Sequence, residues 1–229
     1  MNKMVKTAII AVVAVGAFVG AKEAITYFRE SGTDALQYAP KKYTDDQIER
    51  ELKEKRSDFQ GQVDSTLDKI TAKQGDYNHD TKTENIAAAA QDYARDGMKQ
   101  HSGEEKIRYA AGVYAGYIVR NTYGNQEYCD RYGVDITEFA TAFREVDPVL
   151  MRNANKYYPS KGWEKILYDE IKTQVMPLIE QEFGEASKIG GVSGKVLCER
   201  LNSAKGAVIQ QMEFKKLMPD LYQVIISAP

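Results

Sequence analysis

Residues 106–135, KIRYAAGVYAGYIVRNTYGNQEYCDRYGVD, constrain the fold of this chain more than any other stretch. Their first part has the spacing of a helix with one apolar face, formed by positions 107, 111, 114 and 118. Gly112 and Gly116, four residues apart, leave a flat strip on which another backbone can pack closely. Glycine often follows the last turn of a helix. The sequence therefore predicts a central helix that stops at Gly124, followed by a turn that leads to Cys129.

The composition is that of a helical protein. The chain has 229 residues, 43% of them hydrophobic, which is enough for one large domain or a domain with an extension. Ala, Glu, Lys, Gln and Leu recur at helical spacing, whereas runs of β-branched residues are few. We expect an all-α fold, an irregular bundle of about six or seven helices with some kinked by proline.

The first 21 residues have the features of an export signal. Lys3 and Lys6 form a short positive region, and residues 7–20 are uncharged and apolar. The run ends in Val-Gly-Ala, small residues of the kind that precede a cleavage site. A membrane-spanning helix needs ~20 apolar residues, and this run ends before Lys22, so residues 1–21 are a cleaved signal peptide or a signal anchor. In both cases the rest of the chain is expected in the periplasm or on the extracytoplasmic face of the inner membrane.

A charged amphipathic helix is expected at residues 44–74, after a connector at residues 22–43. It begins with a capping box of Thr44 and Gln47. A narrow apolar stripe then follows at positions 48, 52, 59, 63, 67 and 70. Such a stripe fits two arrangements. One is a coiled-coil arm through which the protein forms oligomers, and the other is an outer helix laid against the domain.

The main domain is expected at residues 79–226. Thr81 with Glu84, and Ser102 with Glu105, have the spacing of capping boxes and predict two successive helices that form an antiparallel hairpin. Both boxes place an acidic residue in the first turn, where the helix dipole favours it.

Later helix boundaries are predicted from caps and breakers. Asp135 is expected to cap one helix, and Asp147 followed by proline is expected to cap the next. A long helix then bends at Pro177 and stops at Gly184. Residues 189–194 form a flexible link to one final helical region.

Cys129 and Cys198 are the only cysteines of the chain. An even number of cysteines in an exported protein indicates a disulfide, which we expect between these two. Closing a loop of about 70 residues contributes ~4 kcal/mol in chain-entropy terms. A redox function is not indicated, because a CxxC motif is absent.

Motifs for metal binding or nucleophilic catalysis are absent from the sequence. His79 and His101 are the only histidines, in a turn and at a helix end, and neither belongs to an HExxH or Cys/His cluster. Ser193 lies in GVSGK, which matches neither a nucleophile elbow nor a complete phosphate loop. We therefore expect no catalytic residue, no metal and no cofactor.

Cell-wall hydrolysis is the competing enzymatic interpretation. Glycan hydrolysis uses two carboxylates in a cleft. The candidates are the acids that flank the central segment: Glu104, Glu105, Asp130 and Asp135. Each of the two glutamates and Asp135 also has a simpler role, at the start of a helix.

Tyrosines are concentrated in the central segment, where six of the fifteen fall between residues 109 and 132. Tyrosine is enriched in binding interfaces because its ring gives contact area and its hydroxyl stays polar. The alternative is a half-buried core whose hydroxyls reach solvent. These tyrosines do not all share one helix face, so we expect some to be exposed. The candidate binding residues are Tyr109, Tyr117, Tyr123, Tyr128 and Tyr132.

Charge excludes one class of partner. The net charge is −2 and the isoelectric point is near 5.9, so nucleic-acid binding is not expected. The sequence favours an exported, non-catalytic envelope protein that binds another envelope protein, either as part of an envelope machine or as a toxin-immunity protein. It would touch the membrane only through residues 1–28, if the signal is not cleaved. The alternatives are a peptidoglycan hydrolase and a carrier of an apolar ligand.

Overall fold

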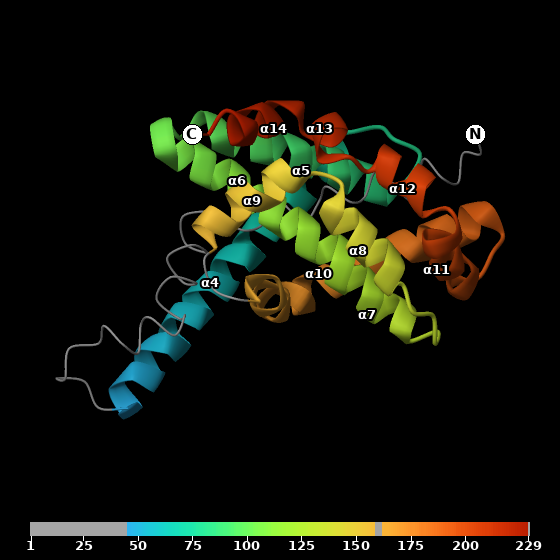
Figure 1. The fold of residues 1–229 in the computed structure, drawn as a ribbon, viewed down its shortest axis with the longest axis horizontal. Helices are drawn as coiled ribbons and strands as arrows, with labels where there is room; N and C mark the ends of the chain where they lie inside the picture. Colours follow the sequence, from blue (N-terminus) through green and yellow to red (C-terminus); the bar gives the residue numbers. More distant parts are fainter. Residues whose placement is uncertain (1–44, 159–161, 229) are drawn as a thin grey trace.

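The computed structural model describes residues 45–158 and 162–228, and within these ranges every regular element is a helix (Figure 1). The all-α class is therefore confirmed. The expected export signal at residues 1–21, the connector at residues 22–43 and the capping residue Thr44 lie outside the described residues. Among the helices of the described part, none combines the length and apolar character needed to cross a membrane.

Helix α4 (Asp45–Lys73) is an outer helix along its second half. It packs there on α5 (Lys82–Lys99) and α10 (Trp163–Gly190), and it buries Phe59, Val63 and Ile70 in the common core. Its first turns extend away from the other helices (Figure 1). A 3-10 turn, η2 (Gln74–Asp76), joins it to the segment that leads into α5.

The hairpin of α5 and α6 (Gly103–Val119) has one of its two expected capping boxes. Thr81 Oγ1 accepts from the amide of Glu84 at 3.1 Å, and Glu84 Oε2 accepts from the amide of Thr81 at 3.1 Å. The box expected at Ser102 is wrong, because the Ser102 side chain makes no capping hydrogen bond. Gly103 directly follows with a φ of 53°, so the chain enters α6 with a backbone geometry that an ordinary first turn does not have.

The central helix is longer than the sequence indicated. It runs from α6 through a π-helical turn, η3 (Arg120–Gly124), into α7 (Asn125–Asp130). The prediction that Gly124 stops it is wrong. A β-carbon on Gly124 would lie 2.5 Å from Ile179 Cδ1, so this glycine permits close contact with α10. Helices α5, α9, α10 and α14 surround α6, and residues 109–122 are all buried.

The π-helical turn is stabilised by its own polar side chains. Asn121 Nδ2 donates to the carbonyl oxygen of Tyr117 at 2.8 Å, and Thr122 Oγ1 donates to that of Ile118 at 2.8 Å. A π turn shifts the backbone hydrogen bonds by one residue, so these side chains supply additional donors to carbonyls in a buried region.

Helices α8 (Thr137–Glu145) and α9 (Pro148–Tyr157) follow the central helix. Asp147 caps α9 as expected, accepting from the amide of Leu150 at 3.1 Å, with proline in the first turn. Asp135 does not occupy the capping position of α8, which begins one residue later than expected. Its carboxylate instead accepts from the backbone amide and the hydroxyl of Thr137, at 2.8 and 2.6 Å.

Helix α10 contains both of its expected breakers. Pro177 is exposed within it, and the helix continues past Gly184 to Gly190. The predicted stop at Gly184 is wrong because Phe183 and Ala186, on either side of it, are buried in the core and hold the helix. The helix ends where Gly191 takes a left-handed φ of 61°.

Residues 194–226 form four short helices, where one final helical region was expected. They are α11 (Gly194–Ser203), α12 (Lys205–Gln211), α13 (Phe214–Leu217) and α14 (Pro219–Ile226). Helix α11 packs on α7 and α8, and α14 returns to α6 and α9. The described chain thus has more helices than the six or seven expected.

Candidate functional site

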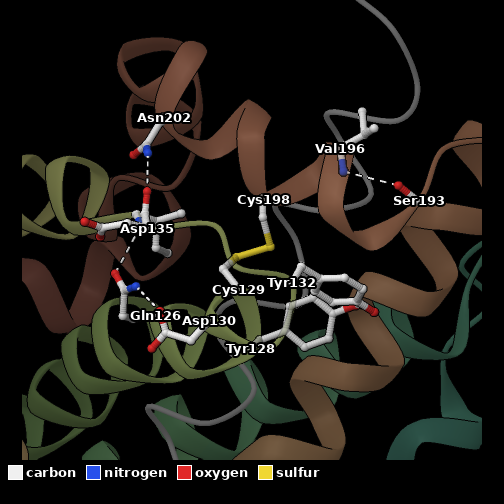
Figure 2. The surroundings of a disulfide bond; sticks show 11 residues. Gln126, Tyr128, Cys129, Asp130, Tyr132, Asp135, Ser193, Val196, Cys198 and Asn202 are labelled. Atoms are coloured by element: carbon white, nitrogen blue, oxygen red, sulfur yellow. Dashed lines mark hydrogen bonds between the residues drawn. A yellow bond between two sulfur atoms is a disulfide. The ribbon is translucent and has the colours of Figure 1, made fainter.

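A disulfide joins the end of the central helix to the start of the C-terminal helices. Cys129 in α7 and Cys198 in α11 are bonded, with their Cα atoms 5.6 Å apart and their positions 69 apart in sequence. The predicted disulfide is therefore present, and both cysteines are fully buried. We call residues 126–136 and 193–202 around this bond the stapled corner (Figure 2).

Two side-chain amides fix the turn of the stapled corner. Gln126 accepts from the amide of Ile136 at 3.2 Å and donates to Asp130 Oδ1 at 2.6 Å. Asn202 donates to the carbonyl oxygen of Asp135 at 2.6 Å (Figure 2). The side-chain oxygen of Asn202 also accepts from the backbone amide of Phe139 at 3.2 Å. The turn after α7 is thus connected to both neighbouring helices by hydrogen bonds as well as by the disulfide.

A pair of tyrosines lies beside the disulfide (Figure 2). The rings of Tyr128 and Tyr132 are 5.4 Å apart and their hydroxyl oxygens 3.3 Å apart. Tyr128 packs on Phe183 at 4.2 Å and is buried, whereas Tyr132 is 42% exposed. A β-carbon on Gly194 would lie 2.8 Å from the Tyr128 hydroxyl oxygen and 2.9 Å from Tyr132, so a larger residue there would require these side chains to shift. Burial, and then the hydrogen bond to Tyr132, raise the pKa of Tyr128 above its ordinary value.

Charged side chains pair with one another at the stapled corner, which also carries the exposed ring of Tyr132. Arg131 pairs with Glu180 of α10 and lies 3.9 Å from Glu127. Glu127 also accepts from the hydroxyl of Tyr168 at 2.8 Å. The corner therefore carries the exposed ring of Tyr132 together with one basic and two acidic groups that pair with one another.

The other candidate tyrosines lie in or near the core. Tyr109 packs on His101 at 5.1 Å, and Tyr117 donates to the carbonyl oxygen of Met212, and both are buried. Tyr123 is half-buried, 5.9 Å from the ring of Tyr168. Residues 109–122 of the central helix are all buried, so the tyrosines among them have no solvent-facing side to occupy. Of the five candidates, only Tyr132 is exposed.

The four candidate acids are not brought together. Glu104 and Glu105 stand at the beginning of α6, where they pair with Arg108 at 2.8 Å and His101 at 4.0 Å. Asp130 is the last residue of α7, and Asp135 lies in the segment that follows it. Residues 103–130 form one continuous helix, which spans about 40 Å at 1.5 Å per residue. Glycosidase carboxylates lie ~5–9.5 Å apart, so acids from the two ends do not flank one bond.

Metal ligation finds no support among the described residues. No group of three or more His, Cys, Asp or Glu side chains in residues 45–158 and 162–228 is placed to hold a metal ion. His79 precedes α5, where its amide donates to Asn85 Oδ1 at 2.9 Å, and His101 follows the same helix.

An ion pair lies in the core beside the π-helical turn, and sequence reasoning missed it. Arg120 is 1% exposed and pairs with Glu182 of α10, which is 5% exposed. Arg120 Nη1 also donates to Asn121 Oδ1 at 2.8 Å. Burial raises the pKa of Glu182, and the charge of Arg120 opposes that shift. A single arginine within an apolar helical run was the only signal in the sequence for this pair.

A small hollow opens between α6, the start of α9 and the segment before α13. Its volume is about 100 Å³. The walls are Tyr114, Tyr117, Ile118, Leu150 and Phe214, with Val146, Asp147, Glu213 and Lys215 also lining it. Pockets for drug-sized ligands measure ~300–1,000 Å³, so this hollow is too small for an extended lipid.

Comparison with models of protein families, with curated proteins and with solved structures finds no match. Two features of the described residues combine defined geometry with access from solvent. One is the stapled corner with the exposed ring of Tyr132. The other is the hollow, where polar groups stand over an apolar floor.

Proposed function

We propose that this protein is an exported, non-catalytic envelope protein that binds another envelope protein through the stapled corner. The observation that carries the proposal is the exposed ring of Tyr132 on a turn that is fixed by the Cys129–Cys198 disulfide. Within the expected helix at residues 44–74, the first turns of α4 are a second contact in the proposal, through which copies of the chain associate, because they extend away from the other helices (Figure 1).

A rigid aromatic group is the kind of anchor on which protein interfaces depend. A few residues contribute most of the binding energy of an interface, and tyrosine is enriched among them. Binding costs less entropy when the anchor is already held in place. Here the disulfide and the amides of Gln126 and Asn202 hold the backbone on which Tyr132 stands. The neighbouring charges of Arg131 and Glu180 suit a rim that selects the orientation of a partner.

The proposed location is supported by the residues at the N-terminus together with the disulfide. Residues 1–21 have the composition of an export signal, and stable disulfides form in oxidising compartments such as the periplasm. An immunity-type protein and a component of an envelope machine both fit this proposal. A toxin encoded by a neighbouring gene would favour the immunity-type protein.

The proposal is tested by crosslinking from one position in living cells. A photoreactive amino acid replaces Tyr132 in one version of the full chain and Ile166 in another, because Ile166 is also exposed, at 39%, but lies on α10 away from the corner. We expect a specific crosslinked partner from position 132 and none from position 166. Tyr132→Ala, in a chain without the probe, should reduce co-purification of that partner at least about tenfold, as for an interface anchor.

Two results would contradict the proposal. Equal crosslinking from positions 132 and 166 would show that the corner is not a specific site. Recovery of the full chain in the cytoplasmic fraction, with residues 1–21 intact, would remove the export on which the choice of partner rests.

A further inference from the structure

The hollow between α6, α9 and α13 has acidic groups that are fixed in place. Asp147 is held by its hydrogen bond to the amide of Leu150 at the start of α9. Glu213 is only 17% exposed and contacts Lys215 Nζ at 2.8 Å. Lys215 is 54% exposed, and Lys216, whose Nζ lies 3.5 Å from Glu213, is 46% exposed. Both have flexible stems, so the basic groups are the ones that can move away.

The pKa of Lys215 indicates which kind of group the two acids favour. The hydrogen bond and the charge of Glu213, with a smaller contribution from Asp147, raise the pKa of Lys215. Both carboxylates therefore stabilise an ammonium group at the hollow. Lys215 and the two acids line the hollow together, and the rest of its lining is made of aromatic and aliphatic side chains.

The interior of the hollow suits the stem and the end of a basic side chain. Tyr114 is 1% exposed, and its hydroxyl has no hydrogen-bond partner among the described residues. The ring of Phe214 lies 5.2 Å from that of Tyr114 and 5.3 Å from that of Tyr117. Aromatic faces attract organic cations, and Ile118 and Leu150 offer an apolar surface to a methylene stem. A phenol oxygen also accepts a hydrogen bond from an ammonium group.

We propose that the hollow is a receptor for one lysine side chain of a protein partner, which takes the place of Lys215 beside Asp147 and Glu213. This inference rests on the proposed function, because the lysine belongs to the partner that the proposed function requires. The volume of about 100 Å³ accommodates one side chain and excludes a drug-sized ligand. The proposal gives the partner a basic residue and gives Lys215 the role of a competitor that the partner displaces.

The probe for this site is n-butylammonium, which has the stem and the charge of a lysine side chain. Its neutral counterpart 1-butanol tests whether the charge matters. Binding to the purified protein is followed by the NMR signals of the Ile118 and Leu150 methyl groups. We expect saturable shifts with butylammonium at millimolar concentration, and none with butanol over the same range.

Four variants assign the contacts. Asp147→Asn keeps a capping side chain and removes the charge, Glu213→Gln keeps the shape, and Tyr114→Phe removes only the hydroxyl. Each should weaken butylammonium binding about threefold to tenfold, as expected for one hydrogen bond or one ion contact. Lys215→Ala should strengthen it about threefold or more, because the competing cation is lost. Lys165→Ala is the control, since Lys165 pairs with Asp169 on α10, and it should change nothing.

Several outcomes would overturn the proposal. They are equal binding of butanol, weaker binding in Lys215→Ala, or no saturable shift in the wild-type protein. Micromolar affinity for free butylammonium would identify a small amine as the ligand in place of a partner's lysine. If the hollow binds butylammonium but position 132 gives no crosslinked partner, the proposed function fails and the binding site in the hollow does not. The two failures can therefore be told apart.

Discussion

Gly124 and Gly184 are both glycines inside helices, but their surroundings are opposite. A β-carbon on Gly124 would meet Ile179 Cδ1 at 2.5 Å, whereas one on Gly184 would meet nothing within 4 Å. Glycine weakens a helix relative to alanine, so its presence at Gly124 has a packing reason that Gly184 lacks. The identity of the residue alone does not distinguish these cases, because the contact joins positions 55 residues apart.

The two glycines predict opposite effects of the same substitution. Gly184→Ala should stabilise the protein by about 0.5–1 kcal/mol through helix propensity. Gly124→Ala should destabilise it by about 1–2 kcal/mol, because overpacking exceeds that gain. Urea unfolding measures both. In an Ile179→Val background, which removes Cδ1, the cost at Gly124 should disappear. A Gly124→Ala protein as stable as Gly184→Ala would show that Ile179 moves aside freely.

The ion pair of Arg120 and Glu182 gives the second prediction at this scale. Removing one partner by Arg120→Met or Glu182→Leu should cost about 3–5 kcal/mol, because an unpaired charge stays buried. Replacing both should cost much less than the sum, since two apolar groups of similar volume need no partner. A double-mutant cycle in urea measures the coupling. Additive losses would show that the two charges do not depend on each other.

Among the elements, two of the four expected caps in the described residues were correct, those at Ser102 and Asp135 were not, and long-range packing was missed. The caps at Thr81 and Asp147 were predicted because a capping side chain and its amide are three residues apart. The extent of α10 past Gly184 was not, because the buried neighbours that hold it come from other helices. For the same reason, Tyr109 and Tyr117 were predicted as surface residues, but the helices around the central helix bury them.

The disulfide was the part of the candidate site that sequence reasoning could determine. With two cysteines only one pairing within the chain exists, and the structure forms it. The hollow and the buried ion pair could not be predicted, because each is formed by segments that are far apart in sequence. In the hollow these separations range from 28 positions, for Ile118 and Val146, to 101 positions, for Tyr114 and Lys215. Neither set has a spacing that marks it as a site.

The disulfide gives a prediction for the elements that it connects. Cys129→Ser with Cys198→Ser should lower the free energy of unfolding by about 4 kcal/mol, because a loop of 69 residues is released in the unfolded chain. Chemical unfolding of this variant measures the loss, and the wild-type protein unfolded with a reducing agent should match it. Unchanged stability in both would mean that the bond constrains neither state. Crosslinking from position 132 should also fall, since the corner loses its covalent link.

Over the whole molecule, α4 to α14 share one core, which includes tyrosines from several helices. Tyr114, Tyr117 and Tyr158 are at most 2% exposed and come from α6 and the end of α9. Burial raises the pKa of each of them well above its ordinary value. The folded protein therefore keeps these phenols protonated where an unfolded chain ionises them.

This distribution predicts a steep loss of stability in alkali. The raised folded pKa values contribute stability that is fully present below about pH 10, the unfolded pKa of tyrosine, and that is lost as the pH rises above it. Each buried tyrosine lowers the free energy of unfolding by about 1.4 kcal/mol per pH unit, or about 4 kcal/mol for the three together. Urea unfolding at a series of alkaline pH values measures the slope. Tyr114→Phe should reduce the slope by about 1.4 kcal/mol per pH unit, because one ionising group is removed and the others remain. A slope unchanged by Tyr114→Phe would mean that this phenol ionises equally well in the folded protein, and that the core around α6 admits water.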